Sequence, residues 1–135
     1  DCVNAETDAV KAETSAITTA ANFKAQLPVI ELGITTETAN KAEIQVKLDA
    51  ATLRLTAAQA KLAAAKTDAD KRLLTTAVSS WTSATRAYAS KIRNIDLTIK
   101  KLEAAKLAAT NKPAELASNV TNARDSAKLI CTKGF

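Results

Sequence analysis

Two cysteines, Cys2 and Cys131, stand near opposite ends of this 135-residue chain and are its only cysteines. A single cysteine pair in a small domain is typical of one disulfide formed in an oxidising compartment. The chain also opens with Asp1 and Cys2 rather than an initiator methionine, as a mature product does after signal-peptide removal. The sequence therefore predicts a secreted, extracellular protein with an intrachain disulfide between Cys2 and Cys131. A redox-active thiol pair and a cysteine-linked dimer are the alternatives.

The apolar residues of the chain are unusually small. Alanine accounts for 30 of the 135 residues, against one Trp, one Tyr and two Phe. Alanine has the highest helix propensity but buries little apolar area per side chain. The composition thus predicts one all-α domain over residues 1–135, with a thin core for which a cross-link between the termini matters.

Helix-breaking and helix-capping residues divide the chain into segments. Pro28 and Pro113 are strong breakers, and residues 67–70 form a helix N-cap sequence. We expect the apolar segment 27–34 to be a connection that covers one end of the bundle. The sequence predicts an elongated antiparallel bundle of four alanine-rich amphipathic helices, or five if the third breaks near 79–94. The expected helices cover about 3–27, 36–66, 68–111 and 114–131.

Two apolar seams run along the second expected helix. The first consists of Ile44, Leu48, Ala51, Leu55, Ala58, Leu62, Ala65 and Ala69. The second lies on the opposite side and consists of Ala39, Ala42, Val46, Ala50, Leu53, Ala57, Ala60 and Ala64. A helix with one neighbour needs one apolar stripe, so the second seam predicts another neighbour, a ligand face or a solvated run of alanines.

The third expected helix carries one seam at heptad spacing from Leu74 to Ala109, and the fourth is expected to turn Leu116, Val120, Ala123, Ala127 and Ile130 inward. The first expected helix is only weakly hydrophobic. In it, Val3, Val10 and Ile17 recur every seven residues beside a stripe made of Ala5, Ala9, Ala12, Ala16, Ala20 and Phe23.

The net charge of +5 is unevenly distributed along the chain. Residues 1–50 carry eight acids and four bases, whereas residues 51–135 carry six acids and fifteen bases. This asymmetry favours packing of an acidic half against a basic half, or contact of the basic half with an anionic partner such as a phospholipid surface. The bases are scattered with almost no aromatic residues between them, so no nucleic-acid partner is expected. No apolar run reaches 18 residues, so no transmembrane segment is expected.

The residues needed for catalysis are missing. The chain has no histidine, and a disulfide leaves no thiolate, so we expect no catalytic residues, no metal site and no cofactor. The protein is therefore predicted not to be an enzyme. One modification is suggested: Asn119 begins an Asn-Val-Thr sequence and is a candidate N-glycosylation site.

Two non-enzymatic functions fit these patterns. The first is binding of a hydrophobic small molecule or a lipid or amphiphilic surface, with Lys91 and Lys100 near an acidic head group. The lining expected for that ligand consists of Val46, Leu53, Trp81, Tyr88 and Ile92. The alternative is a structural or protein-interaction module that forms homo-oligomers through an exposed alanine-rich helix face.

Overall fold

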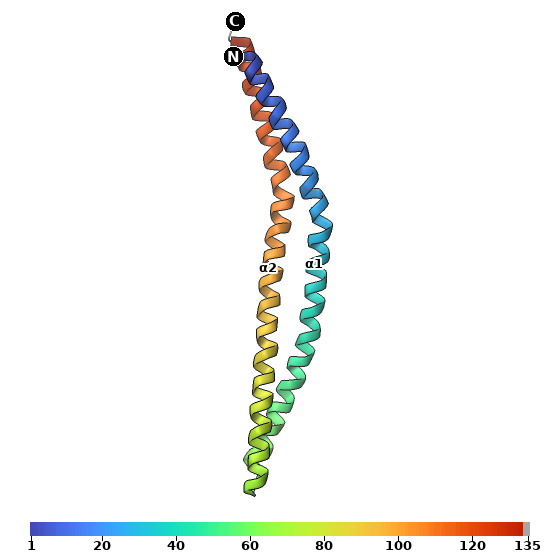
Figure 1. Cartoon of the computed structure of the whole chain (residues 1–135), viewed down its shortest axis with the longest axis vertical. Helices are drawn as coiled ribbons and strands as arrows, with labels where there is room; N and C mark the ends of the chain where they lie inside the picture. The colour runs from blue at the N-terminus through green and yellow to red at the C-terminus, as the bar shows by residue number, and fades with distance from the viewer. Residues whose placement is uncertain (134–135) are drawn as a thin grey trace. The chain divides into compact units, whose positions relative to one another are not determined.

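The computed structural model describes residues 1–133, which are all-α and contain no β-strand. It has two long helices, α1 (Cys2–Ala64) and α2 (Asp68–Lys133), joined by the short turn 65–67 (Figure 1). The predicted helical class is confirmed. The predicted count of four or five helices is wrong, because the described residues form two.

The error in the helix count arises at the two prolines, which lie inside helices. Pro28 is within α1 and Pro113 is within α2. A proline inside a helix removes one backbone hydrogen bond, and its ring clashes with a backbone carbonyl. Together these effects destabilise the helix by about 3 kcal/mol. The apolar spacing nevertheless continues across Pro28: Leu27 and Ile30 are partly buried, while Pro28 itself is exposed. Segment 27–34 is therefore helix rather than a connection.

The alternative of a break near 79–94, which would have given a fifth helix, is also wrong, because α2 is continuous from Asp68 to Lys133. The threonine hydroxyls of this region bond to the helix itself, as the Thr82 Oγ1 shows by donating to the Val78 carbonyl at 2.7 Å. Such a bond leaves the backbone helical and satisfies the hydroxyl. The serine- and threonine-rich stretch is thus compatible with an unbroken α2.

Side chains cap the start of each helix. The Asp70 N–H donates to Thr67 Oγ1 at 3.1 Å, and the Asn4 N–H donates to Asp1 Oδ1 at 3.1 Å. Asp68 and Asp70 lie in the first turn of α2, where the helix dipole favours negative charge. The predicted N-cap at Thr67 is confirmed, and it fixes the point where α2 begins.

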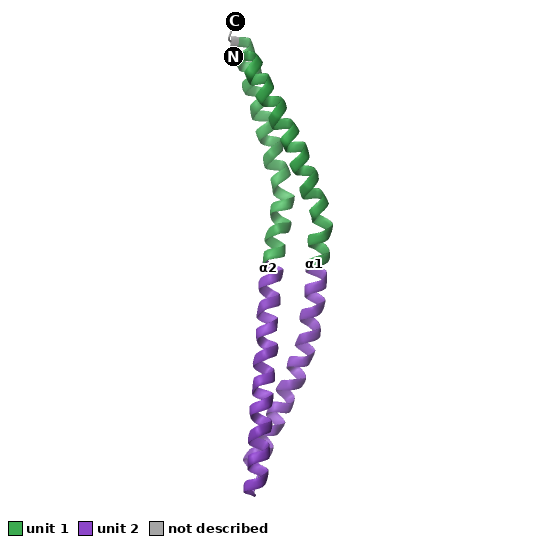
Figure 2. Ribbon diagram, in the orientation of Figure 1, with its two compact units in different colours: residues 1–33, 101–135 green, residues 34–100 purple. Residues whose placement is uncertain are grey.

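The chain divides into two compact units, and each combines a segment of α1 with a segment of α2 (Figure 2). Unit 1 contains Asp1–Gly33 and the chain from Lys101 onward, and unit 2 contains Ile34–Lys100. Within each unit the two segments run in opposite directions, as the colours of Figure 1 show. Unit 1 contains the disulfide, and unit 2 contains the turn between the helices.

The core of each unit is made by heptad seams that face each other across the two helices. The predicted seam from Ile44 to Ala65 is partly or fully buried, except that its last member, Ala69, is exposed at the start of α2. The predicted seam from Leu74 to Ala109 is also buried to varying degrees, apart from the exposed Lys106. These seams are confirmed as the surfaces along which α1 and α2 pack.

This core is thin, as the alanine content predicted. The fully buried apolar residues of the described chain are Ala9, Ala51, Ala58, Ala109 and Ala127. No large side chain in the described range is fully buried. Small residues let two helix backbones approach closely, but each removes little apolar area from water. Two helices alone therefore give the chain a core of limited depth.

Ion pairs link α1 and α2 within each unit. In unit 1 Arg124 pairs with Glu13 at 2.5 Å and Lys106 approaches Glu31 at 3.8 Å; in unit 2 Lys41 pairs with Asp96 at 2.7 Å. All of these side chains are about half exposed, so each pair adds little to stability. They are formed in the one antiparallel alignment that the apolar seams set.

Candidate interaction surface on α1

An uncharged seam runs along the face of α1 that does not contact α2. We call it the outer seam. It comprises eighteen exposed residues spaced three or four apart: Val3, Thr7, Val10, Thr14, Ile17, Ala21, Ala25, Pro28, Leu32, Thr35, Ala39, Ala42, Val46, Ala50, Leu53, Ala57, Ala60 and Ala64. This is the spacing of a helix face that packs against another helix.

Six branched aliphatic side chains make the outer seam strongly apolar. They are 61–73% exposed: Val3, Val10, Ile17, Leu32, Val46 and Leu53. The threonines add little polarity, since the Thr7 hydroxyl donates to the Val3 carbonyl at 2.9 Å and the Thr14 hydroxyl to the Val10 carbonyl at 3.0 Å. Their donors are satisfied inside α1. The outer seam therefore offers a partner an apolar surface.

The exposed surface of α2 has no continuous apolar seam like that of α1. Leu73, Leu97, Leu107 and Leu129 are exposed on α2, and Ile130, which was expected to face inward, is 42% exposed at the end of the packed face. They do not recur at heptad spacing, and bases such as Lys91, Lys100 and Lys101 are exposed among them. Exposed apolar residues scattered singly are ordinary on a protein surface. The candidate interaction surface is thus confined to α1.

The residues predicted to line a ligand site fall on two different surfaces. Val46 and Leu53 lie in the outer seam, on the face of α1 turned away from α2. Trp81, Tyr88 and Ile92 are partly buried in the seam of α2 that faces α1. This structure does not bring the two sets together in one cavity.

Nearby cations contact the two aromatic rings of this predicted lining. The guanidinium of Arg54 lies 5.2 Å from the centre of the Trp81 ring, and the Lys91 Nζ lies 6.0 Å from that of Tyr88. Trp81 is therefore covered by a side chain from α1. Lys100 and Asn119, the predicted head-group and glycosylation residues, are both exposed on α2.

The chain exposes more area than a compact monomer of the same mass. The chain exposes 9458 Å². A compact monomer of 14.2 kDa exposes about 6,800 Å², so the excess is roughly 2,700 Å². A stable protein interface needs about 800 Å² from each partner. The chain thus has enough surplus surface to form such an interface.

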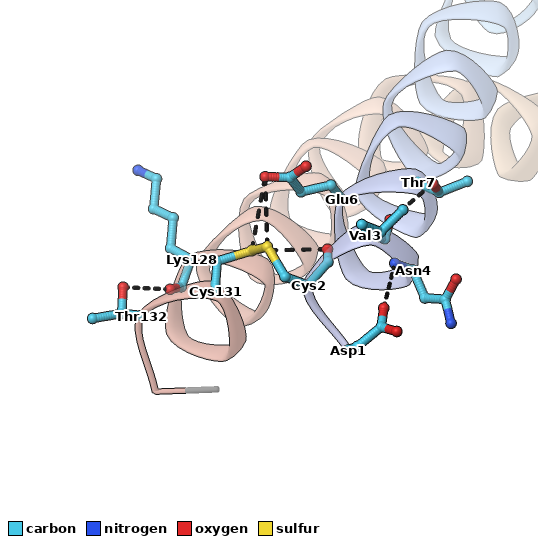
Figure 3. The surroundings of a disulfide bond; sticks show 9 residues. All are labelled: Asp1, Cys2, Val3, Asn4, Glu6, Thr7, Lys128, Cys131 and Thr132. Carbon is cyan, nitrogen blue, oxygen red and sulfur yellow. Dashed lines mark hydrogen bonds between the residues drawn. A yellow bond between two sulfur atoms is a disulfide. The ribbon is translucent and has the colours of Figure 1, made fainter. Parts of the chain in front are cut away.

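The predicted disulfide is present in unit 1, where it joins the start of α1 to the end of α2. Cys2 and Cys131 are bonded with their Cα atoms 4.7 Å apart. The Glu6 Oε1 lies 3.8 Å from the Cys2 sulfur and 3.7 Å from the Cys131 sulfur (Figure 3). The two sulfurs carry no proton in the disulfide, so these are close contacts of a carboxylate with the bridge. The same three side chains would be the ligands of a metal only if the bridge were reduced to thiolates.

Because of this contact, we expect Glu6→Gln to speed reduction of the disulfide by an external thiol, roughly two- to five-fold at low salt. The attacking species is a thiolate, and the Glu6 carboxylate repels it at the point of attack. The rate is measured with a small anionic thiol on the folded protein. Asp8→Asn is the matched control, since it removes one acid two residues further along α1 from a side chain that does not contact the bridge. Equal rates for wild type and Glu6→Gln would show that the carboxylate does not protect the bond.

A shallow groove of about 520 Å³ lies beside the disulfide in unit 1. Its apolar lining comes from the buried Ala9 and Ala127 and from Val10 of the outer seam, and the ion pair of Glu13 with Arg124 also lines it. The volume is within the range of small-molecule sites. None of the residues predicted to line a ligand site contributes to this groove.

Comparison with protein-family models, curated proteins and solved structures finds no significant match to this chain. Within the described residues, neither helix contains a stretch long and apolar enough to cross a membrane.

Proposed function

We propose that this chain is a secreted, non-enzymatic structural module that forms homo-oligomers through the outer seam of α1. The observation that carries the proposal is the run of eighteen exposed, uncharged positions at helix-packing spacing, with six Val, Ile and Leu side chains 61–73% exposed. Complete burial of each such side chain is worth about 1.5–3 kcal/mol. A neighbour on this face would supply the second layer that the alanine core lacks.

The composition of the outer seam favours a protein helix over a lipid surface as its partner. Helices that lie in membrane interfaces combine large aromatic or leucine side chains with flanking Lys and Arg. The outer seam contains no aromatic residue, and its flanks carry acids as well as bases, among them Glu6, Lys11 and Arg54. Its alanines and threonines suit the close approach of a second helix backbone. A helix-on-helix contact is therefore the better match.

Sedimentation equilibrium of the oxidised protein at tens of micromolar tests this proposal. We expect a dimer or larger species in which the Cys2–Cys131 disulfide remains within each chain, as non-reducing mass spectrometry would show. A monomer at this concentration would contradict the proposed function.

Binding of an amphiphile is a second candidate, favoured by the groove beside the disulfide. Its apolar lining residues suit an acyl chain, and Lys128 suits an anionic head group, since Arg124 is already paired with Glu13. The test is saturable binding of a polarity-sensitive dye that a long-chain fatty acid displaces. Absence of saturable binding would remove this candidate without affecting the first.

A further inference from the structure

We infer that two copies of this chain pack outer seam against outer seam with their α1 helices antiparallel, in one register. In that register, facing residues have numbers that add up to 67. The inference rests on the proposed function, because it names the partner, a second copy, and the geometry of its contact.

The spacing of the outer seam is symmetric about its centre. Each of its eighteen positions maps onto another seam position when its number is subtracted from 67. The seam departs from alternating three–four spacing at two places, 17–21–25 and 42–46–50, and these two places map onto each other. Two antiparallel helices stay in contact only if such irregularities coincide. In this register they do.

The side chains that meet in this register are complementary in size. The nine kinds of facing pair are Val3–Ala64, Thr7–Ala60, Val10–Ala57, Thr14–Leu53, Ile17–Ala50, Ala21–Val46, Ala25–Ala42, Pro28–Ala39 and Leu32–Thr35. No pair brings two Val, Ile or Leu side chains together. Large residues facing small ones keep the distance between two helices even and fill the space between them. The seam is therefore complementary to itself when reversed.

A parallel pair would pack less evenly. Each seam residue would then face its own copy, so Leu53 would meet Leu53 between layers in which Ala50 meets Ala50 and Ala57 meets Ala57. The helices would have to separate at the leucines and approach at the alanines. Gaps of this kind lose van der Waals contact and are costly in a packed interface.

The charges beside the outer seam distinguish the two arrangements. In the antiparallel register, Glu6 and Glu13 flank Ala63 and Thr56 of the other copy, and Lys11 is brought beside Arg54. Arg54 is held over the Trp81 ring at 5.2 Å, on the side of α2, which reduces this single like-charge contact. In a parallel pair, Lys11 would instead lie beside Glu6 of the other copy.

Cysteine cross-linking tests the register in the full oxidised chain. Val10→Cys and Ala57→Cys are prepared as separate proteins, mixed to allow exchange of subunits, and treated with a short bismaleimide that leaves the native disulfide intact. We expect efficient linkage of Val10→Cys to Ala57→Cys in the mixture and little linkage of either variant to itself. Ile17→Cys with Ala50→Cys should behave in the same way. Ser15→Cys, exposed outside the seam, is the control that should not link to Ala57→Cys.

The possible results separate the register of the two helices, the surface in contact and the oligomeric state. Self-linkage of Val10→Cys would overturn the antiparallel register in favour of a parallel one. A dimer that links through neither pair, or that links equally through the Ser15→Cys control, would show that the outer seam is not the contact. A monomer by sedimentation would instead refute the proposed function itself.

A charge substitution gives an independent readout. Lys11→Glu replaces the weak like-charge contact with Arg54 by an attractive one in the antiparallel register, so we expect the dimer to tighten by about two-fold at low salt. In a parallel pair the same substitution would set the introduced carboxylate beside Glu6 of the other copy and weaken the dimer. Tightening supports the antiparallel register, and weakening overturns it.

Discussion

The Leu53→Glu variant is expected to be a monomer at concentrations where the wild-type chain is a dimer, with a dissociation constant raised at least about a hundred-fold. In the single chain Leu53 is 73% exposed, so a glutamate there is solvated and lowers the stability of the fold little. In the dimer the same position is covered by the other copy, and an unpaired carboxylate would be buried at both symmetry-related sites. The measurement is sedimentation equilibrium over a concentration series.

Two further variants separate the loss of contact from a loss of fold. Gln59→Glu adds the same charge at an exposed position of α1 outside the outer seam, and it should leave the dimer intact. Leu53→Ala removes the side chain without adding charge and raises helix propensity, and it should weaken the dimer by about ten-fold or more. A Leu53→Glu protein that still dimerises with the wild-type constant would place the interface elsewhere.

The fold class and the packing surfaces could be predicted from the sequence because they depend on periodicity. The seams of Ile44–Ala65 and Leu74–Ala109 repeat at sevens over many turns, and only helices that face one another satisfy such a pattern. The disulfide was predictable from cysteine number alone. Cys2 lies at the start of the 63-residue α1 and Cys131 near the end of the 66-residue α2, so the bridge joins the ends of two helices of nearly equal length.

The number of helices could not be predicted by treating each proline as a boundary. A proline inside a helix costs a fixed few kcal/mol, whereas breaking the helix here would interrupt a seam packed along its whole length. The usable signal was the phase of the seam: Phe23, Leu27, Ile30 and Ile34 keep three–four spacing across Pro28, and Ala109, Pro113 and Leu116 keep it across Pro113. When phase persists through a proline, the helix continues.

The candidate site was predictable only in pieces. The seam from Ala39 to Ala64 and the heptad of Val3, Val10 and Ile17 were both visible, but a supposed connection at 27–34 separated them. Once α1 is one helix, the two pieces become one outer seam through Ala25, Pro28 and Leu32. Val46 and Trp81, which we assigned to one lining, lie on different surfaces, because periodicity shows which residues share a face but not which faces meet.

The largest effect on stability is expected from removing the disulfide with Cys2→Ser and Cys131→Ser together. The bridge spans 129 residues, and in the chain-entropy model a loop of that length is worth about 5 kcal/mol. Small domains have only about 5–15 kcal/mol in total, so we expect loss of much of the stability and a Tm lower by on the order of 15 °C. Denaturant and thermal unfolding are measured at a concentration where both proteins are monomers, since dimerisation would add stability of its own.

Because the core is thin, the disulfide is expected to supply a larger share of the total stability than it would in an ordinary globular domain. In unit 1 the other links between α1 and α2 include the packing of Ala9, Ala109 and Ala127 and half-exposed ion pairs, which contribute little each. Wild-type protein reduced with a phosphine should behave like the double variant, which controls for the serine side chains. Hydrogen exchange should then lose protection first near Cys2 and Cys131 and retain it longest beside the Thr67-capped turn. If the double variant loses less than about 1 kcal/mol, the ends of α1 and α2 are held by helix packing rather than by the bridge.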